Sequence, residues 1–247
     1  MNKADMLARL REETLACHKC RLSSTRTKVV FGEGDPESPL VIVGEGPGAT
    51  EDETGIPFVG KAGRLLTECL MECGIERKRV FICNVVKCRA CIVGEKTIKN
   101  RPPEPDEIDS CKDWLLGQLA ILQPMVILAL GAPATRFLLG RQNVAMTKER
   151  GVFYESAFGI PVIPSLHPSY ILRNQYKDGD GGKSLLVADI EAARKKVIEL
   201  KRAKKRSEET GDKAPKVPAE RPAEQDAAPE SAEPFDKYSF REKELGI

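Results

Sequence analysis

The chain has 247 residues, of which 41% are hydrophobic and 31% are charged. This length suits one large domain or two small ones and excludes a disulfide-stapled mini-protein. No apolar run approaches the ~18 residues that span a bilayer, and the first residues lack the features of a signal peptide. We therefore expect no membrane partner and a cytoplasmic location, where eight cysteines serve as thiols or metal ligands rather than disulfides.

The net charge of +2 is unevenly distributed. Residues 207–247 hold six Lys and Arg against eleven Asp and Glu, a net charge of −5, so residues 1–206 carry +7. A basic body permits a polyanionic partner. Residues 207–247 are rich in Pro, Ala and Glu and predict a disordered acidic tail behind a single domain over 1–206. Aromatic residues near the end of the tail are either a docking peptide for a protein partner or, as we favour, a loosely ordered terminus.

Helix-like and strand-like segments alternate along the body. Apolar residues at helical spacing predict a helix over 4–16, and Leu40–Val43 predicts a buried strand. Further helices are predicted over 61–74, 105–122, 132–139 and 182–206, and further strands over 80–86, 125–130 and 160–163. Apolar strands separated by helices indicate an α/β fold with a parallel sheet covered on both faces. Ligands bind such sheets beyond the carboxyl ends of the strands.

Two glycine-rich sequences resemble nucleotide-binding motifs, and we reject both. Residues 44–49 fit the dinucleotide fingerprint G-x-G-x-x-G/A directly after a strand. That fingerprint needs a helix that starts inside it, whereas the prolines and glycines here predict a long loop, and no acidic residue ends the next strand. Residues 55–62 spell most of a P-loop, but the last position is Ala62, which lacks the hydroxyl that binds magnesium.

Five of the eight cysteines have the spacing of metal ligands. Cys17 and Cys20 form one C-x2-C pair, Cys88 and Cys91 form another, and Cys111 follows. Paired thiolates hold one metal ion or cluster edge from a single turn. The pairs are too far apart for a zinc ribbon, so the site would tie the N-terminal segment to the body, with zinc and a four-iron cluster both open on spacing. The other three are predicted core residues: Cys69, Cys73 and Cys83.

Functional side chains follow three of the predicted strands. Glu45 and then Phe58 follow the first strand, Asn84 ends the second, and His167 follows the fourth. Because parallel strands present their carboxyl ends at one edge of the sheet, one crevice would gather a carboxylate, an aromatic ring, an amide and an imidazole. A lone histidine is more often structural, but a proline-restricted loop after a strand favours a catalytic role for His167.

Three sequences in chain order closely resemble the iron–sulfur (family 4) uracil-DNA glycosylases: VIVGEGPGATEDETGIPFVGKAGRLL, NVVKC and SLHPSYILR. The resemblance extends over residues 10–200 and implies a three-layer α/β/α sandwich around a four-stranded parallel sheet. It implies a monomeric, monofunctional hydrolase that removes uracil from uracil-containing DNA and so initiates base-excision repair. It also implies a 4Fe-4S cluster that ties down the N-terminal segment through Cys17, Cys20, Cys88 and Cys111.

The chemistry of base removal agrees with this resemblance. An enzyme that works on a base extracts it from the stack and encloses it, and Phe58 is placed to stack on the extruded ring. Asn84 would pair with O4 and N3–H of uracil, whereas cytosine would leave buried polar groups unpaired at ~1–3 kcal/mol each. His167 would hydrogen-bond O2 and stabilise the departing anion.

The remaining roles concern water, sugar and DNA. Glu45 would orient water or stabilise the cationic sugar, with the backbone of Gly44 and Gly46 as an alternative means of positioning water. Residues from Ser169 to Leu172 would wedge into the gap left by the extruded nucleotide. The charge of the body would supply phosphate contacts.

The sequence departs from the family pattern between Cys88 and Cys111, where 22 residues intervene. Cys91 lies in this longer segment, so either Cys88 or Cys91 would be the ligand. A related group that becomes covalently trapped on uracil DNA carries a histidine in its insert; residues 90–100 hold none, which predicts ordinary turnover. The alternative functions are a DNA-binding relative with altered chemistry and a zinc-stabilised nucleotide-binding protein.

Overall fold

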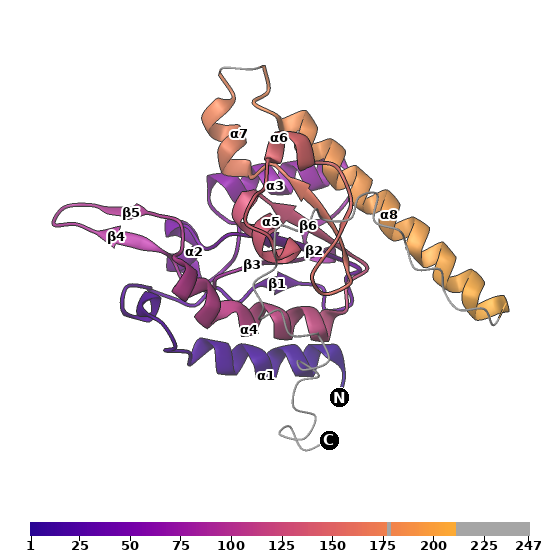
Figure 1. Cartoon of the computed structure of the whole chain (residues 1–247). Helices are drawn as coiled ribbons and strands as arrows, with labels where there is room; N and C mark the ends of the chain where they lie inside the picture. The colour runs from indigo at the N-terminus through magenta and orange to yellow at the C-terminus, as the bar shows by residue number, and fades with distance from the viewer. Residues whose placement is uncertain (177–178, 211–247) are drawn as a thin grey trace.

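A six-stranded sheet forms the centre of the computed structural model, which describes residues 1–176 and 179–210 (Figure 1). The four inner strands are parallel and lie in the order β3 (Phe81–Asn84), β2 (Leu40–Gly44), β6 (Val126–Leu130) and β8 (Pro161–Ser165). Antiparallel two-residue strands add the edges, β1 (Glu33–Gly34) beside β3 and β7 (Tyr154–Glu155) beside β8. The predicted parallel sheet is confirmed, and the edge strands enlarge it from four strands to six.

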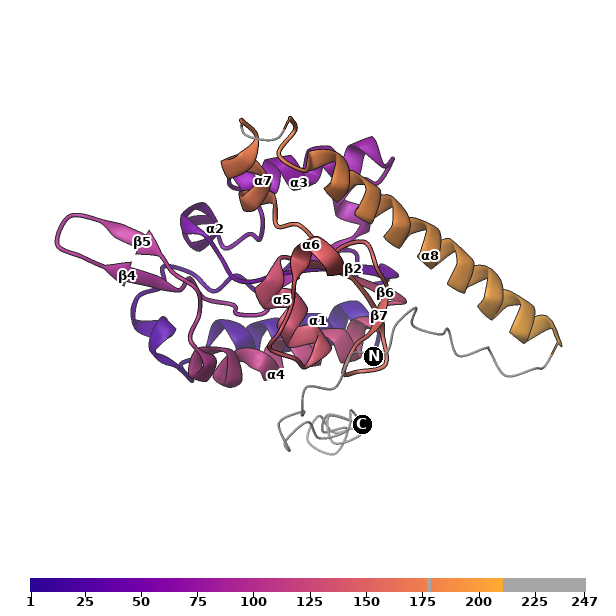
Figure 2. The same ribbon diagram turned by 45° about the horizontal axis from the view of Figure 1, so that its top comes forward.

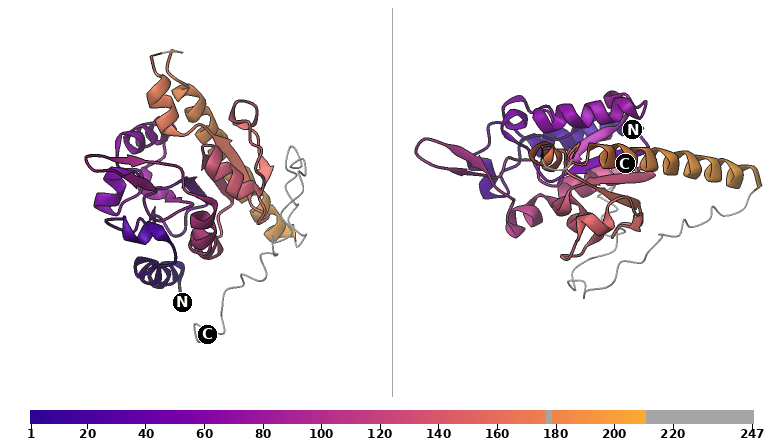
Figure 3. Two further views of the ribbon diagram at one scale, coloured as in Figure 1. Left: turned by 60° about the vertical axis from the view of Figure 1, so that its left-hand side comes forward. Right: turned by 90° about the horizontal axis from the view of Figure 1, so that it is seen from above.

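Helices cover both faces of this sheet (Figures 1 and 3). One hydrophobic cluster joins the sheet to α4 (Pro105–Leu122) and α5 (Ala132–Leu139), with α1 (Lys3–Leu15) packed on α4. The opposite cluster joins the sheet to α3 (Lys61–Glu72), α7 (Pro168–Asn174) and α8 (Lys183–Thr210). Because successive strand residues point to opposite faces, both of which are buried, the strands are continuously apolar in sequence.

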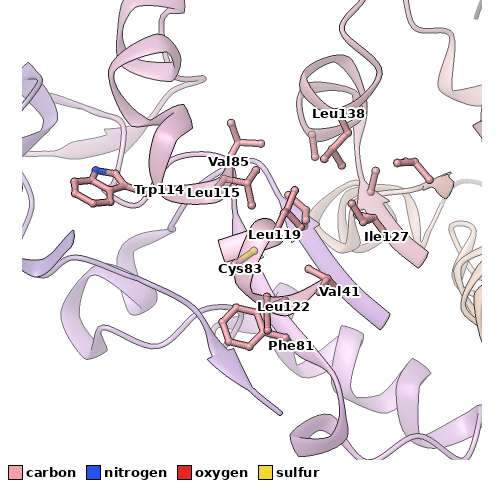
Figure 4. Close-up of a cluster of buried hydrophobic side chains, with 14 of the residues drawn as sticks. Val41, Phe81, Cys83, Val85, Trp114, Leu115, Leu119, Leu122, Ile127 and Leu138 are labelled. Atoms are coloured by element: carbon pink, nitrogen blue, oxygen red, sulfur yellow. The ribbon is translucent and has the colours of Figure 1, made fainter. Parts of the chain in front are cut away.

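The first cluster is seen in Figure 4, where residues of α4 meet the sheet. Leu115, Leu119 and Leu122 of this helix pack against Val41 and Phe81 of neighbouring strands. All are at most 3% exposed. Burying side chains of this size stabilises the fold by about 1.5–3 kcal/mol each, and it holds the strand ends in fixed positions at the carboxyl edge.

Several short elements near that edge depart from the predictions. Residues 49–54, predicted as part of a long loop, form the helix α2 (Ala49–Thr54). At its start the Glu51 carboxylate accepts a hydrogen bond from the N–H of the N-cap residue Gly48, and Gly55 ends it with a φ of 80°. One of the two reasons for rejecting the dinucleotide fingerprint therefore fails. The other stands, because β3 ends in Asn84 and not in an acidic residue.

The remaining elements include a hairpin and a long terminal helix. The hairpin consists of β4 (Cys91–Val93) and β5 (Ile98–Asn100), and a short helix α6 (Met146–Glu149) precedes β7. The helix α8 continues to Thr210, past the predicted boundary at residue 206, and projects beyond the body (Figures 1 and 2). The rest of the predicted tail, 211–247, lies outside the described residues. Within the described part, no helix is both long and apolar enough to span a membrane.

Candidate active site

One cavity of about 560 Å³ lies at the carboxyl edge of the sheet. Its lining includes Glu45, Phe58, Asn84 and His167, which the chain supplies from separate segments after β2, β3 and β8. The structure therefore brings together the four side chains that the sequence predicts to converge. This volume falls within the range of about 300–1,000 Å³ that is usual for small-molecule pockets.

Two glycines allow Phe58 to take its place in the cavity wall. A Cβ atom on Gly44 would lie 2.5 Å from both the Asn84 Oδ1 and the Phe58 Cζ. A Cβ atom on Gly63, in α3, would lie 1.9 Å from the backbone carbon and oxygen of Phe58. Only glycine at these two positions leaves room for Phe58 to pack against β2 and α3. The sequence predicts that the backbone of Gly44 helps to position water. The structure adds that the absence of a side chain at Gly44 makes room for Phe58 and Asn84.

The backbone at Phe58 is held in an unusual conformation by Arg77. Phe58 has a φ of 51°, a region that residues other than glycine seldom adopt. The Arg77 guanidinium donates to the carbonyl oxygens of Phe58 at 3.1 Å and Pro57 at 2.5 Å. It also pairs with the Glu33 carboxylate at 2.9 Å. Arg77 thus fixes a strained loop from the outside, as is common where side chains must be held for function.

The same loop is held from the other side by Glu51. Its carboxylate accepts hydrogen bonds from the backbone N–H groups of Val59 at 3.0 Å, Gly60 at 2.8 Å and Gly48 at 3.1 Å. One acidic side chain therefore joins the segment after β2 to the loop that carries the aromatic ring. Sequence reasoning missed this role, and the only local signal was a glutamate three residues after Gly48, the position from which a side chain can reach back to the N-cap N–H.

Asn84 carries an unpaired polar atom into this cavity. The residue is 1% exposed, and its Oδ1 has no hydrogen-bond partner. Its backbone carbonyl is fixed by the Lys87 ammonium at 2.7 Å, which also donates to the Gln118 Oε1 at 2.6 Å. Burial lowers the pKa of Lys87. An unmade buried hydrogen bond costs about 1–3 kcal/mol, so this acceptor is suited to a ligand that supplies an N–H group.

His167 is a neutral hydrogen-bond donor in the lining of the same cavity. Its Nδ1 accepts from the Ser169 N–H at 3.1 Å, which caps α7 and leaves the ring proton on Nε2. Enclosure in the cavity wall lowers its pKa to about 4. Its ring centre lies 5.8 Å from that of Phe58, at an interplanar angle of 36°. The predicted loop after β8 is thus a helix start that orients the imidazole.

Glu45 is half-buried at the start of the segment after β2, where Gly46 also lines the cavity. Burial raises the pKa of its carboxyl group, and the positive charge of Arg136 opposes this shift. The backbone carbonyl of Glu45 accepts from the Val86 N–H at 3.1 Å, which anchors the segment to the chain after β3. The carboxyl group therefore lies at the cavity and loses its proton at a higher pH than an exposed glutamate does.

The helix α7 forms one wall of the cavity, with Ser169, Tyr170 and Arg173 in its lining. Tyr170 is 46% exposed. Ile171 is 2% exposed and packs in the hydrophobic cluster, so its predicted part in a wedge is wrong. A helix turns successive side chains by about 100°, which sends Tyr170 outward and Ile171 inward.

A second, much smaller cavity is lined by the four predicted metal ligands, Cys17, Cys20, Cys88 and Cys111. Cys91 is absent from this lining and instead begins β4. The predicted core cysteines are all buried in the two hydrophobic clusters: Cys69, Cys73 and Cys83. The segment after α1, the segment after β3 and the helix α4 thus meet at one group of thiols.

Three N–H donors point at these sulfur atoms. Trp114 Nε1 lies 3.3 Å from the Cys17 Sγ, Arg26 lies 3.3 Å from the Cys88 Sγ, and the Lys87 backbone N lies 3.2 Å from the Cys111 Sγ. Burial raises the pKa of Cys111 to about 12. Among residues 1–176 and 179–210, no group of three or more His, Cys, Asp or Glu side chains is arranged to hold a metal ion. Four thiols around a cavity, with donors that offset thiolate charge, do fit the donor set of an iron–sulfur cluster.

A mostly parallel sheet with a pocket of small-molecule size at its carboxyl edge and four thiols around a second, smaller cavity defines an α/β protein with a ligand site at the usual place for such sheets. The chain belongs to the uracil DNA glycosylase superfamily, whose family model matches residues 31–191. It is 44% identical over 192 residues to a type-4 uracil-DNA glycosylase of Thermotoga maritima, which covers 78% of this chain and 95% of that protein.

Other relatives extend this finding. A type-4 uracil-DNA glycosylase of Sulfurisphaera tokodaii is 42% identical over 177 residues, covering 69% of this chain and 77% of that protein. A type-5 uracil-DNA glycosylase of Thermus thermophilus is 31% identical over 158 residues, covering 57% and 68%. The family resemblance seen in the sequence is therefore confirmed.

Proposed function

We propose that this protein is a monofunctional uracil-DNA glycosylase that extrudes uracil from DNA and hydrolyses its N-glycosidic bond, initiating base-excision repair. The observation that carries the proposal is the buried, unpaired Oδ1 of Asn84 in one cavity with Glu45, Phe58 and His167. The names of the type-4 relatives support the same activity.

Base selection follows from the amide of Asn84. Its Oδ1 accepts from the N3–H of uracil, and its Nδ2 donates to O4. Cytosine presents an acceptor at N3 and a donor at the neighbouring amino group, so both contacts are reversed. The ring of Phe58 stacks on the extruded base, and the fixed loop around it limits the ring to one orientation.

Bond cleavage follows from the imidazole of His167. As the N1–C1′ bond breaks, its electron pair moves onto the base and negative charge grows on O2. The Nε2–H of neutral His167 donates to this oxygen and stabilises the charge. Glu45 stabilises the cationic sugar or orients the water that adds to C1′, and the backbone of Gly44 and Gly46 helps to place that water. The water adds its oxygen to C1′, and the proton that it loses is taken up by the departing uracil anion, which leaves an abasic site and neutral uracil.

We also propose that Cys17, Cys20, Cys88 and Cys111 hold a 4Fe-4S cluster. The donor set and the N–H groups around the sulfurs support this assignment. When bound, the cluster supplies four metal–sulfur bonds between the N-terminal segment, the chain after β3, and α4. These bonds would fix the N-terminal segment to the α/β/α sandwich. The colour of the purified protein distinguishes the two metals, because an iron–sulfur cluster is brown and a zinc site is colourless.

The proposed activity is tested on a duplex that holds a single uracil. We expect alkali to cut the treated strand at that position and to leave matched duplexes with thymine or cytosine there intact. A DNA-binding relative without the chemistry would bind the duplex and leave it uncut, and that result would remove the enzymatic proposal.

A further inference from the structure

The hairpin of β4 and β5 projects from the body beside the candidate active site (Figures 1, 2 and 3). It lies between Cys88 and Cys111 in the chain. The two strands form a sheet of their own, closed by a turn in which the Gly94 N–H donates to the Thr97 carbonyl at 2.9 Å. The proposed mechanism of base removal uses none of these residues.

The hairpin exposes large apolar side chains. Ile92, Val93 and Ile98 are 61%, 59% and 55% exposed. Val93 lies opposite Ile98 in the strand register, so the two form an apolar pair on one face. An isolated hairpin is at best marginally stable in water, and exposed apolar groups held together in this way usually mark a binding surface.

The face that carries this apolar pair leads to the cavity. Cys91 lies opposite Asn100 in the register, two residues from the Val93–Ile98 pair, so both pairs share a face. Asn100 and the following Arg101 line the cavity, on which α7 contributes Tyr170 and Arg173. The hairpin is thus a continuation of the cavity wall. A strand that delivers an extruded base into the cavity would pass its root.

The charge of the hairpin suits a polyanion. Residues 89–101 hold four basic side chains and one acidic side chain. Arg101 pairs with the buried Glu107 at 2.6 Å. Lys96, in the turn, and Lys99, opposite Ile92, form no ion pair with the described residues. Two lysines therefore remain for phosphates: Lys96 in the turn, and Lys99 on the face that carries Ile92, opposite to the face of the Val93–Ile98 pair.

We propose that this hairpin lies along the DNA strand beside the extruded nucleotide, with the Val93–Ile98 face against sugars. Lys96 in the turn and Lys99, whose long side chain extends from the opposite face, reach phosphates at the edges of the hairpin. The proposal rests on the proposed function, because it takes uracil-containing DNA as the ligand of the cavity. Three strand residues reach ~10 Å at about 3.3 Å per residue. That length matches about three base pairs at a rise of about 3.4 Å.

The test measures the salt dependence of binding to a two-turn duplex that carries a tetrahydrofuran abasic analogue. We compare Lys96→Gln/Lys99→Gln with the control Lys201→Gln/Lys205→Gln, which removes the same charge from exposed positions of α8 at the far side of the molecule (Figure 1). Each lost phosphate contact lowers the slope of log Kd against log salt by about 0.9. We expect a decrease of about 1.8 in the hairpin variant, equivalent to about a twelvefold difference between 50 and 200 mM salt, and no decrease in the control.

The apolar pair and the reach of the hairpin are tested separately. Val93→Ser/Ile98→Ser should weaken binding to the same duplex about tenfold, as expected for two lost apolar contacts. Two further duplexes are each shortened to a single base pair on one side of the lesion, one duplex for each side. The differences in binding between the wild type and both hairpin variants should disappear with one of these duplexes and persist with the other. Single-turnover uracil release at saturating enzyme should stay within about twofold of wild type, because the cavity is unchanged.

The outcomes separate the two proposals. If the wild-type protein releases no uracil, the proposed function fails. If it releases uracil and the hairpin variants keep wild-type affinity and salt slope, the hairpin proposal alone is overturned, and its apolar surface would belong to a protein partner instead.

Discussion

Gly44 and Asn84 approach so closely that a single methyl group between them would collide with the side-chain amide of Asn84. A Cβ on Gly44 would lie 2.5 Å from the Asn84 Oδ1. Asn84 is buried and its backbone is fixed by Lys87, so it has no room to retreat.

We therefore predict that Gly44→Ala lowers uracil excision by about 100-fold, because misplacing a group by about 1 Å costs a factor of this size. Overpacking should also lower the free energy of unfolding by about 1–3 kcal/mol. Single-turnover excision and thermal unfolding measure the two effects. Wild-type excision in a folded Gly44→Ala variant would contradict the packing of this pocket.

The lowered pKa of His167 predicts a pH dependence of stability. In the unfolded chain the imidazole takes up a proton near pH 6.5, but in the folded protein only near pH 4. Between these values the unfolded state binds more protons, so the free energy of unfolding falls as the pH falls from about 6.5 to about 4. At neutral pH the histidine is uncharged in both states and contributes no such loss.

His167→Asn provides the matched comparison, since asparagine retains a good helix cap for α7 without titrating. Melting temperatures at about pH 7.5 and about pH 5 should differ less in the variant than in the wild type. Equal differences in the two proteins would show that His167 is not held neutral by the fold.

Asn84→Asp should change base selectivity. A carboxylate accepts from the amino group of cytosine but cannot donate to O4 of uracil, so we expect excision of uracil to fall about 100-fold and excision of cytosine to become measurable. Affinity for a duplex with an abasic analogue should remain unchanged. The ratio of kcat/KM for the two bases is the measurement, and an unaltered ratio would exclude Asn84 from base recognition.

Arg77 should act as a positioning residue for Phe58. Arg77→Met removes the bonds to two loop carbonyls, and Arg77→Lys keeps the charge without the planar fork. We expect kcat to fall about 10- to 100-fold in Arg77→Met, with a partial recovery in Arg77→Lys and little change in affinity for abasic DNA. A fall in affinity with kcat intact would instead place Arg77 in DNA binding.

Cys88 and Cys91 provide a matched test of the metal site. Cys88 lines the cavity with three other thiols, whereas Cys91 begins the hairpin. Cys88→Ser should lose the visible absorption and most of the bound iron, and Cys91→Ser should keep both. Iron content and the visible spectrum decide between them. The reverse result would assign the ligand to Cys91.

The sequence predicts the elements that carry strong local patterns. The helix over 105–122 and the stop of the helix over 132–139 at Gly140, where φ is 65°, agree with the structure. The convergence of Glu45, Asn84 and His167 was also predictable, because parallel strands present their carboxyl ends at a common edge.

Other features depend on partners that are distant in sequence. The edge strands have two residues each and carry no periodic pattern. Arg77 acts on Phe58 across 19 positions of the chain, and no local signal marks that contact. The exposed strands of the hairpin lack the half-buried alternation by which strands are recognised. Tertiary packing therefore decides these features.

The segment from Asn84 to Cys88 is buried throughout and has only three residues between its ends. The Lys87 ammonium donates to the backbone carbonyl of Asn84, and the Lys87 backbone N–H donates to the sulfur of Cys111. A displacement of the Cys111 sulfur would consequently be passed to the backbone of Asn84 through one fully buried residue, Lys87, with no exposed or loosely packed position between them.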